Sequence, residues 1–459
     1  MTPPAANDLF TPALQRIRSY LTVHDAAPLI GALTLLHVSQ DFSLSTAPED
    51  HPTGAALLQQ IEAALAPLLG DRLDHPIQLH DHGLPPEVLS ELSTLINLSI
   101  QRTELSSPDG TGRQVIAAAF TELLEQASRS QRDADHLTPR TLSQLSAAVL
   151  DVRPGMRVLD FALGYGGTWL AVAARLTAQG LDPNSVQFVG QDIRPENLIV
   201  AACHLQLHGL TRFSLHLGDV LTAPQTEPGA FDRVIADPPF GLPLRPRTDW
   251  NLDPRFLAAR TLPRFADWPL ILHGLAALAP GGRAVFTTAH GPLFRSGSER
   301  DIRNDYVARW LTAVVALPSA LYTGANVPVA LTVFDRPTST VAAGNDVLMV
   351  DASQLGVRDG RQHILSAEVV DRLTTLIATR NDPESPAIHE SVPQARIAEN
   401  DHSWQPSRYV SRPALPTRGL NEIRADLAEA HKAVQHAAAA MDQALDALNR
   451  SFPGENERM

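Results

Sequence analysis

The chain has 459 residues, enough for about two to four domains, and its 44% hydrophobic content allows a sizeable core. A formal net charge of −13 does not favour a stand-alone DNA-binding protein, because such proteins neutralise phosphates with basic side chains. The sequence shows no apolar run long enough to span a membrane and no signal peptide at its N-terminus. A single cysteine, Cys203, excludes an internal disulfide, and we expect a cytoplasmic protein.

Residues 8–130 are predicted to be mostly helical, because apolar residues such as Leu14, Ile17 and Leu21 recur at helical spacing. From about residue 136 to 340, short apolar runs alternate with helical segments. The predicted helices include Thr168–Gln179 and Pro195–His208. The predicted strands are Val158–Asp160, Val186–Val189, Ser214–Leu217, Arg233–Ala236, Arg283–Thr287, Val314–Leu317 and Val329–Phe334. Val329–Phe334 is expected to be the last strand of the series. The alternation predicts an α/β fold with a mostly parallel, doubly wound sheet.

The remaining residues predict a linker and a long helix. Residues 377–396 carry prolines and charges, which favours a linker. A helix is predicted from Leu420 to Leu448, with coiled-coil positions at Leu420, Leu427, Val434, Met441 and Leu448, followed three residues later by Ile423, Ala430, Ala437 and Ala444. Such a helix can pack on its own domain or on a partner, and the sequence leaves both open.

The turn Asp237-Pro238-Pro239-Phe240 ends one of the predicted strands. Neither proline has an N–H to donate, so the sheet ladder stops there in a stiff turn. Asp237 and the Pro238 carbonyl group can accept hydrogen bonds from the exocyclic amine of a flat base, and Phe240 can stack on its ring. A purely structural turn would have the same residues, so the interpretation depends on the flanking sequence.

A glycine-rich turn follows the first predicted strand. It begins at Asp160 and contains Gly164, Gly166 and Gly167 before the next helix starts. Glycines in such a turn let the backbone approach a ligand closely, but several nucleotide-binding folds share this feature.

Acidic residues end four of the predicted strands: Asp160, Asp192, Asp219 and Asp237. Asp192 is placed to bind the two hydroxyls of a ribose, and Asp219 to accept a hydrogen bond from an adenine amine. Each acid alone could be a capping residue. Ligands of open α/β sheets bind at the carboxyl ends of the strands, so the four acids in order favour a nucleoside cofactor at one edge.

His204 and His208 lie four residues apart on a predicted helix, which is also the spacing of a pair of metal ligands. No glutamate follows His204, and the sequence offers no evident third ligand. We therefore predict no metal site.

This order of elements resembles the S-adenosylmethionine-dependent amino-methyltransferases. More narrowly, the chain is similar over nearly its whole length to the modification (M) subunit of type I restriction–modification systems, an N6-adenine DNA methyltransferase. The segments that resemble blocks of this family are Ile17–Leu33, Leu137–Arg140, Gly190–Pro195, Gly291–Arg303, Ala316–Tyr322 and Glu399–Val410.

The resemblance implies a Rossmann-like class I methyltransferase sheet that binds S-adenosylmethionine and methylates N6 of a flipped-out adenine in DNA. It also implies a specificity (S) subunit as partner, docked through the C-terminal helix, and leaves open whether a restriction subunit binds too. The candidate cofactor-binding residues are Leu137, Thr138, Pro139, Arg140, Asp160, Gly164, Tyr165, Gly166, Gly167, Asp192 and Asp219, and the candidate catalytic residues are Asp237, Pro238, Pro239 and Phe240.

The expected domains are a helical N-terminal domain (1–130), an S-adenosylmethionine-dependent methyltransferase domain (131–345), an α/β extension and linker (346–416), and a C-terminal coiled-coil helix (417–459). The chain departs from the family at several positions. In the glycine turn, Phe161, Leu163 and Tyr165 replace Pro, Cys and Ser, and Tyr165 puts bulk beside the expected cofactor carboxylate. Asp237 replaces the usual Asn, and Asp192 replaces Glu, and both keep an acceptor oxygen.

Two other functions are compatible with these residues. The same D/N-P-P-F/Y turn serves enzymes that methylate guanine N2 in RNA or a glutamine amide in proteins. The altered glycine turn is also compatible with an M-like scaffold or regulatory protein that has lost turnover. The nucleoside that gains a labelled methyl group distinguishes the first alternative, and titration with S-adenosylmethionine distinguishes the second.

Overall fold

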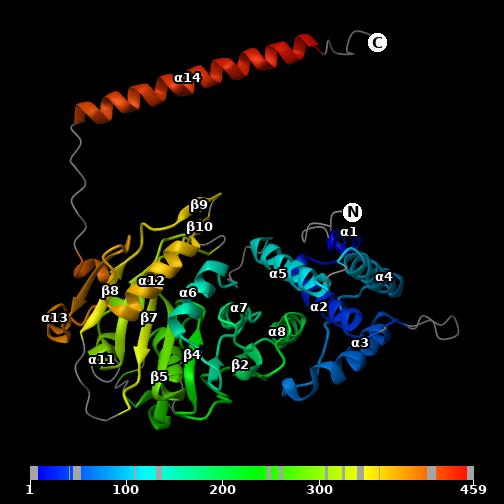
Figure 1. Ribbon diagram of the computed structural model, residues 1–459, viewed down its shortest axis with the longest axis horizontal. Helices are drawn as coiled ribbons and strands as arrows, with labels where there is room; N and C mark the ends of the chain where they lie inside the picture. Colours follow the sequence, from blue (N-terminus) through cyan, green and yellow to red (C-terminus); the bar gives the residue numbers. More distant parts are fainter. Residues whose placement is uncertain are drawn as a thin grey trace. The chain divides into compact units, whose positions relative to one another are not determined.

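The structure is a computed structural model that describes residues 9–40, 42–44, 53–107, 110–130, 137–245, 250–257, 261, 263–304, 309–322, 326–338, 346–360, 362–410 and 420–451. The chain divides into two compact units, Met1–Val410 and Ser411–Met459. The first unit contains a helical region and a large sheet (Figure 1).

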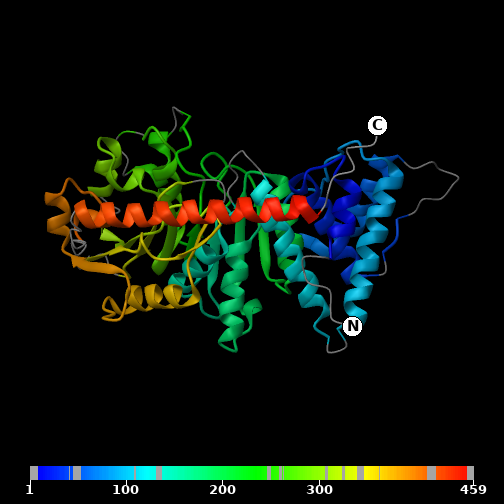
Figure 2. The ribbon, with the colours of Figure 1, turned by 90° about the horizontal axis from the view of Figure 1, so that it is seen from above.

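The helical region confirms the prediction for the first part of the chain. Its helices are α1 (Thr11–Ile17), α2 (Val23–Ser39), α3 (Gly54–Leu69), α4 (Pro86–Leu105) and α5 (Gly112–Ser130). The central helix, α2, packs on α3, α4 and α5 through buried side chains that include Ile30 and Leu33. The Thr22 side chain caps α2 by accepting a hydrogen bond from the Asp25 N–H (3.2 Å). Figure 2 shows these helices, in blue to cyan, beside the sheet region.

The central sheet has nine strands among the described residues, in the order β11-β8-β6-β7-β5-β4-β1-β2-β3. The strands are β1 (Arg157–Asp160), β2 (Gln187–Asp192), β3 (Phe213–Leu217), β4 (Phe231–Ala236), β5 (Leu278–Ala289), β6 (Leu311–Ala316), β7 (Val329–Asp335), β8 (Val347–Asp351) and β11 (Ile388–Val392). All seven predicted strands are present. β7 runs antiparallel to β5 and β6, and β11 runs antiparallel to β8, while the other neighbouring pairs are parallel.

Two predictions for the later part of the chain are wrong. Val329–Phe334 does not close the sheet, because β8 and β11 extend it beyond β6. Residues 377–396 are not a linker, because they contain β11 and enter helix α13 (Gln394–Glu399). The strand β11 has the polar core sequence His389-Glu390-Ser391, and it lies at the edge of the sheet, where polar side chains reach solvent. The residues of β11 form a strand because they hydrogen-bond to β8, and their polar composition alone would not predict one.

Helices cover both faces of the sheet, as a doubly wound fold requires. One face carries α6 (Arg140–Leu150), α7 (Gly167–Ala178), α8 (Pro195–Leu207) and α12 (Ala367–Thr379), and the other carries α9 (Asp267–Ala277), α10 (Gly291–Phe294) and α11 (Ser298–Asn304). Neighbouring residues of a strand enter different cores, as Val158 and Leu159 do. The first core continues into the helical region, because α8 also packs on α2 and α5.

Two smaller elements complete the described residues. A hairpin of β9 (Val357–Asp359) and β10 (Gln362–Ile364) lies outside the main sheet. The second unit consists of α14 (Leu420–Ser451), which confirms the predicted C-terminal helix. The side chains of Leu427, Val434 and Met441 on this helix are exposed. No helix within the described ranges has the length and hydropathy that crossing a bilayer requires.

Candidate functional site

The four predicted acids lie at one edge of the sheet. β1 pairs in parallel with β2 and β4, and β2 pairs in parallel with β3. Asp160 and Asp192 are the last residues of β1 and β2, and Asp219 and Asp237 come directly after β3 and β4. Because these strands are parallel neighbours, their carboxyl ends meet at the same edge.

The glycine turn between β1 and α7 adopts backbone conformations that favour glycine. Gly164 has a φ of 54° and Gly166 a φ of 75°. The Gly164 N–H donates to Asp192 Oδ2 (2.9 Å), which fastens the turn to the end of β2. A Cβ atom added at Gly164 or Gly167 would meet no described protein atom within 4 Å, so this backbone faces open space.

The three residues that depart from the family's glycine turn are each held by other parts of the protein. Phe161 packs in the second core, with its ring centroid 5.2 Å from that of His273. Leu163 packs in the first core, where a Cβ atom at Gly190 would lie 2.8 Å from it. The Tyr165 hydroxyl lies 2.9 Å from His24 Nδ1 in α2. The Tyr165 side chain thus reaches the helical region.

Asp160 is buried at the centre of the edge. Its Oδ1 accepts a hydrogen bond from the Ala162 N–H (3.0 Å). Burial, together with the nearby carboxylates of Asp237 and Asp192, raises the pKa of Asp160 to about 8, and the Ala162 N–H opposes this shift. A positively charged ligand at this edge would stabilise the ionised form of Asp160 and offset the repulsion among the three carboxylates.

Asp192 and Asp219 occupy the two neighbouring strand ends. Asp192 Oδ1 accepts from the Arg194 N–H (3.0 Å) and from Asn197 Nδ2 (3.2 Å). Burial raises the pKa of Asp192, and these donors oppose that shift. Asp219 Oδ1 accepts from the Leu221 N–H (2.9 Å) in a tight turn. Both acids are held in place by neighbouring backbone, so their carboxylates have defined positions.

Asp237 receives two short hydrogen bonds from hydroxyl groups. Thr138 Oγ1 donates to Oδ2 and the Tyr322 hydroxyl donates to Oδ1, both at 2.6 Å. Burial of the carboxyl group raises the pKa of Asp237 to about 6, and Thr138, Tyr322 and Thr287 oppose the shift. Burial and the charge of Asp237 raise the pKa of Tyr322 well above its usual range, so Tyr322 remains a donor. Three hydroxyl donors leave about one lone pair of the carboxylate for a ligand.

The rest of the turn is built around Tyr322 as well. Pro238 is buried, Pro239 is exposed and Phe240 is half-buried. The Phe240 ring meets the Tyr322 ring edge-on, with centroids 5.6 Å apart. Tyr322 thus contacts both the acid and the aromatic residue of the turn. The sequence analysis missed this role, although Tyr322 ends one of the segments that carry the family resemblance.

The predicted cofactor element Leu137–Arg140 reaches the site through one residue. Thr138 donates to Asp237, while Pro139 precedes α6 and Arg140 is the exposed first residue of that helix. Leu137 is half-buried. Of the four candidates, Thr138 is the one with a described hydrogen bond to another candidate residue.

Arg255 is a further residue that sequence reasoning missed. Its guanidinium group donates to the Val220 and Leu221 carbonyl oxygens at 2.6 and 3.2 Å, and it forms an ion pair with Asp253 at 2.6 Å. These bonds hold the segment that follows Asp219. No motif surrounds Arg255, and its partners Val220 and Leu221 are 35 and 34 residues away, so no local pattern marks this contact.

Comparison with known proteins identifies the family. Residues 112–416 match the model of the N-6 DNA Methylase family. The methylase subunit of the type I restriction enzyme HindI from Haemophilus influenzae is 26% identical over 296 residues, which cover 62% of this chain and 65% of that protein. The methylase subunit of the type I restriction enzyme MjaIX from Methanocaldococcus jannaschii is 25% identical over 388 residues, which cover 76% of this chain and 67% of that protein. The chain spans about two thirds of the length of these relatives.

A solved structure shares the fold. The methyltransferase subunit of a type I restriction–modification system from Streptococcus thermophilus superposes with a TM-score of 0.71 at 20% identity, over 90% of this chain and 100% of that one. The family match covers more than half of the sequence, and the strand order agrees with the fold that the resemblance implied. The chain belongs to the N-6 DNA methylase family.

Proposed function

We propose that this protein transfers a methyl group from S-adenosylmethionine to N6 of an adenine in DNA, as the modification subunit of a type I-like restriction–modification complex. The observation that carries the proposal is the position of Asp237. Its carboxyl group begins the Asp-Pro-Pro-Phe turn directly after β4, and β4 pairs in parallel with β1, whose last residue is Asp160. A turn suited to a base amine therefore adjoins an edge suited to a nucleoside cofactor.

The residues at this edge fit S-adenosylmethionine. Open space over Gly164 and Gly167 leaves room for a ligand against the backbone. Asp160 and its neighbouring acids would stabilise the positive charge of the cofactor. Asp192 would accept hydrogen bonds from the ribose hydroxyls, and Asp219 would accept one from the adenine amine. When bound, the cofactor supplies an electrophilic methyl group on a sulfonium.

The Asp-Pro-Pro-Phe turn would hold the target base. The lone pair of an adenine N6 is delocalised into the ring, which makes it a poor nucleophile. Asp237 and the Pro238 carbonyl group would accept hydrogen bonds from the amine and draw the nitrogen toward tetrahedral geometry. The base must leave the DNA stack, and stacking on Phe240, worth about 1–3 kcal/mol, offsets part of that cost.

Asp237 would also stabilise the positive charge that develops on the amine. With a pKa of about 6, its carboxyl group is ionised at neutral pH and can take up a proton from N6 at an oxygen. Thr138 and Tyr322 fix the orientation of the carboxylate, and this positioning is a main source of rate.

The proposed partners are DNA and a specificity subunit, with a restriction subunit as an open question. The net charge of −13 means that the chain alone offers little electrostatic affinity for DNA. The exposed apolar residues Leu427, Val434 and Met441 of α14 support docking of the S subunit along this helix. We expect weak or no methylation by the isolated chain and activity with the partner.

The test is to express the chain with its neighbouring gene products and to map N6-methyladenine in the host DNA. Methylation of one recognition sequence is expected with the wild type, and its absence with Asp237→Ala. Asp237→Asn is the matched variant, because an amide keeps one acceptor oxygen and should keep part of the activity. Labelled methyl on guanine in RNA or on protein would instead favour the other amine substrates. A chain that binds no S-adenosylmethionine would favour the scaffold.

A further inference from the structure

Tyr165 is anchored at two points outside the glycine turn that contains it. Its hydroxyl lies 2.9 Å from His24 Nδ1 in α2, and its carbonyl oxygen lies 2.9 Å from His204 Nδ1 in α8. Gly164 and Gly166, on either side, have positive φ angles and no side chains to restrict them. The contacts of Tyr165 therefore add to the Gly164–Asp192 hydrogen bond in holding the turn.

The contact at the carbonyl group belongs to a chain of polar contacts that runs from His204 to Thr121 and His208. A carbonyl oxygen only accepts, so His204 Nδ1 carries the hydrogen. Burial lowers the pKa of His204 to about 3, so the ring is neutral and its Nε2 is an acceptor, 2.8 Å from the Thr121 hydroxyl, whose hydrogen the Ala117 carbonyl oxygen also approaches (3.1 Å). The Thr121 oxygen also lies 3.0 Å from His208 Nε2. The two histidines that have the spacing of metal ligands thus connect α5 to the glycine turn.

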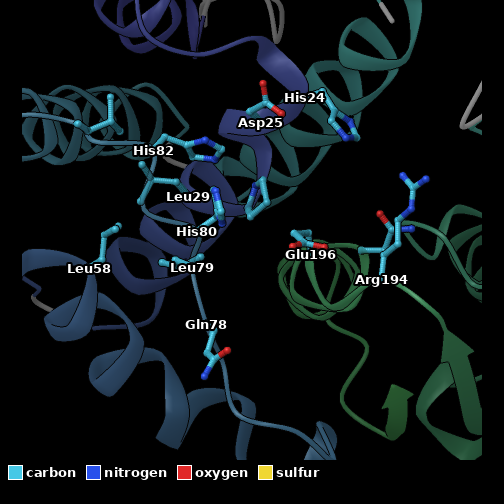
Figure 3. Close-up of a pocket in the computed structure, with 13 residues that line it drawn as sticks. His24, Asp25, Leu29, Leu58, Gln78, Leu79, His80, His82, Arg194 and Glu196 are labelled. Carbon is cyan, nitrogen blue, oxygen red and sulfur yellow. The ribbon is translucent and has the colours of Figure 1, made fainter. Parts of the chain in front are cut away.

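The contact at the hydroxyl lies beside a pocket. Burial raises the pKa of Tyr165 to about 12, so its hydroxyl keeps its hydrogen. His24 lines a pocket of about 270 Å³ between α2, the segment 78–84 and the start of α8, where Arg194 and Glu196 lie (Figure 3). The hydrogen bond between Tyr165 and His24 links the glycine turn to α2 beside this pocket.

We propose that Tyr165 is a positioning residue through which the helical region sets the conformation of the glycine turn. Its bonds to His24 and His204 hold Gly164–Gly167 in the form that accepts the cofactor, so that binding does not have to order the turn. This inference rests on the proposed function, because it assigns the turn to S-adenosylmethionine. If Tyr165 has this role, cofactor affinity depends on residues of α2 and α5, which belong to the helical N-terminal domain predicted for residues 1–130.

The test is isothermal titration of the full chain with S-adenosylmethionine. Tyr165→Phe and His24→Ala each remove the same hydrogen bond, so each is expected to weaken binding by about 3- to 10-fold, the range for one neutral hydrogen bond. The double variant is expected to bind no more weakly than the weaker single variant, because only one bond is lost. Hydrogen exchange at residues 161–167 is expected to be faster in Tyr165→Phe.

A matched control separates this role from general loss of stability. Tyr409→Phe removes another buried tyrosine hydroxyl, which donates to the Ser403 carbonyl oxygen (2.5 Å) away from the turn, and it should leave cofactor affinity unchanged. With active complex, Tyr165→Phe should raise KM for the cofactor and leave kcat unchanged. Unchanged affinity in Tyr165→Phe, or fully additive effects in the double variant, would overturn the proposal. If the wild type itself binds no S-adenosylmethionine, the proposed function fails and this inference fails with it.

Discussion

Tyr322→Phe removes one hydrogen-bond donor from Asp237 and leaves an aromatic ring against Phe240. The Tyr322 hydroxyl donates to Asp237 Oδ1 at 2.6 Å and stabilises the ionised carboxylate. A hydrogen bond to a charged group contributes about 1.5–3 kcal/mol, and about 1.4 kcal/mol corresponds to one pKa unit. Loss of the donor is therefore expected to raise the pKa of Asp237 by about one to two units.

The assay is single-turnover DNA methylation by the reconstituted complex as a function of pH. In the wild type, the rate is expected to fall as the pH drops through about 6, because protonated Asp237 no longer stabilises charge on the amine. In Tyr322→Phe, the fall should begin at a higher pH. Asp237→Asn is the control, because an amide does not titrate and this limb of the profile should disappear. If the methylation rate falls at the same pH in Tyr322→Phe as in the wild type, the reasoning is refuted.

Three further predictions concern other parts of the chain. Gly164→Val puts a side chain into the open space at a φ of 54°, so titration should detect no cofactor binding, and stability should fall by about 1–2 kcal/mol; normal binding would contradict the assigned site. Burial lowers the pKa of His204 from 6.5 to about 3. Below pH 6.5 the unfolded chain therefore binds a proton that the folded chain lacks. The free energy of unfolding decreases as the pH is lowered from 6.5 to about 3, by at most about 1.4 kcal/mol per pH unit. His204→Gln should flatten this slope in urea denaturation, and an unchanged slope would count against a neutral His204. Val434→Asp on α14 should prevent co-purification with an S subunit and leave cofactor titration unchanged; retained co-purification would argue against docking along this helix.

Local pattern was enough to predict most of the sheet. Strands such as β1 and β4 are short apolar runs bounded by turn residues, so periodicity alone located them. The edge strand β11 was missed because its residues His389-Glu390-Ser391 are polar and become a strand through hydrogen bonds to β8. The order of acids at strand ends likewise followed from topology, since parallel strands bring their carboxyl ends together.

The contacts that complete the site could not be predicted in this way. Tyr322 and Thr138 meet at Asp237 although they are 85 and 99 residues away from it in sequence. Tyr165 reaches His24 across 141 residues. Such pairs depend on how distant segments pack in the folded protein, and a single sequence carries no local signal for them. The family resemblance marked the segments that contain these residues, but it did not assign their contacts.

The measurement that tests the central claim most directly is the fate of a labelled methyl group. The complex of the chain with its partner subunits is incubated with DNA and methyl-labelled S-adenosylmethionine, and the DNA is digested to nucleosides. The account predicts label in N6-methyladenine with the wild type, and none with Asp237→Ala, although that variant still binds the cofactor. Label in another nucleoside, or equal labelling by Asp237→Ala, would contradict it.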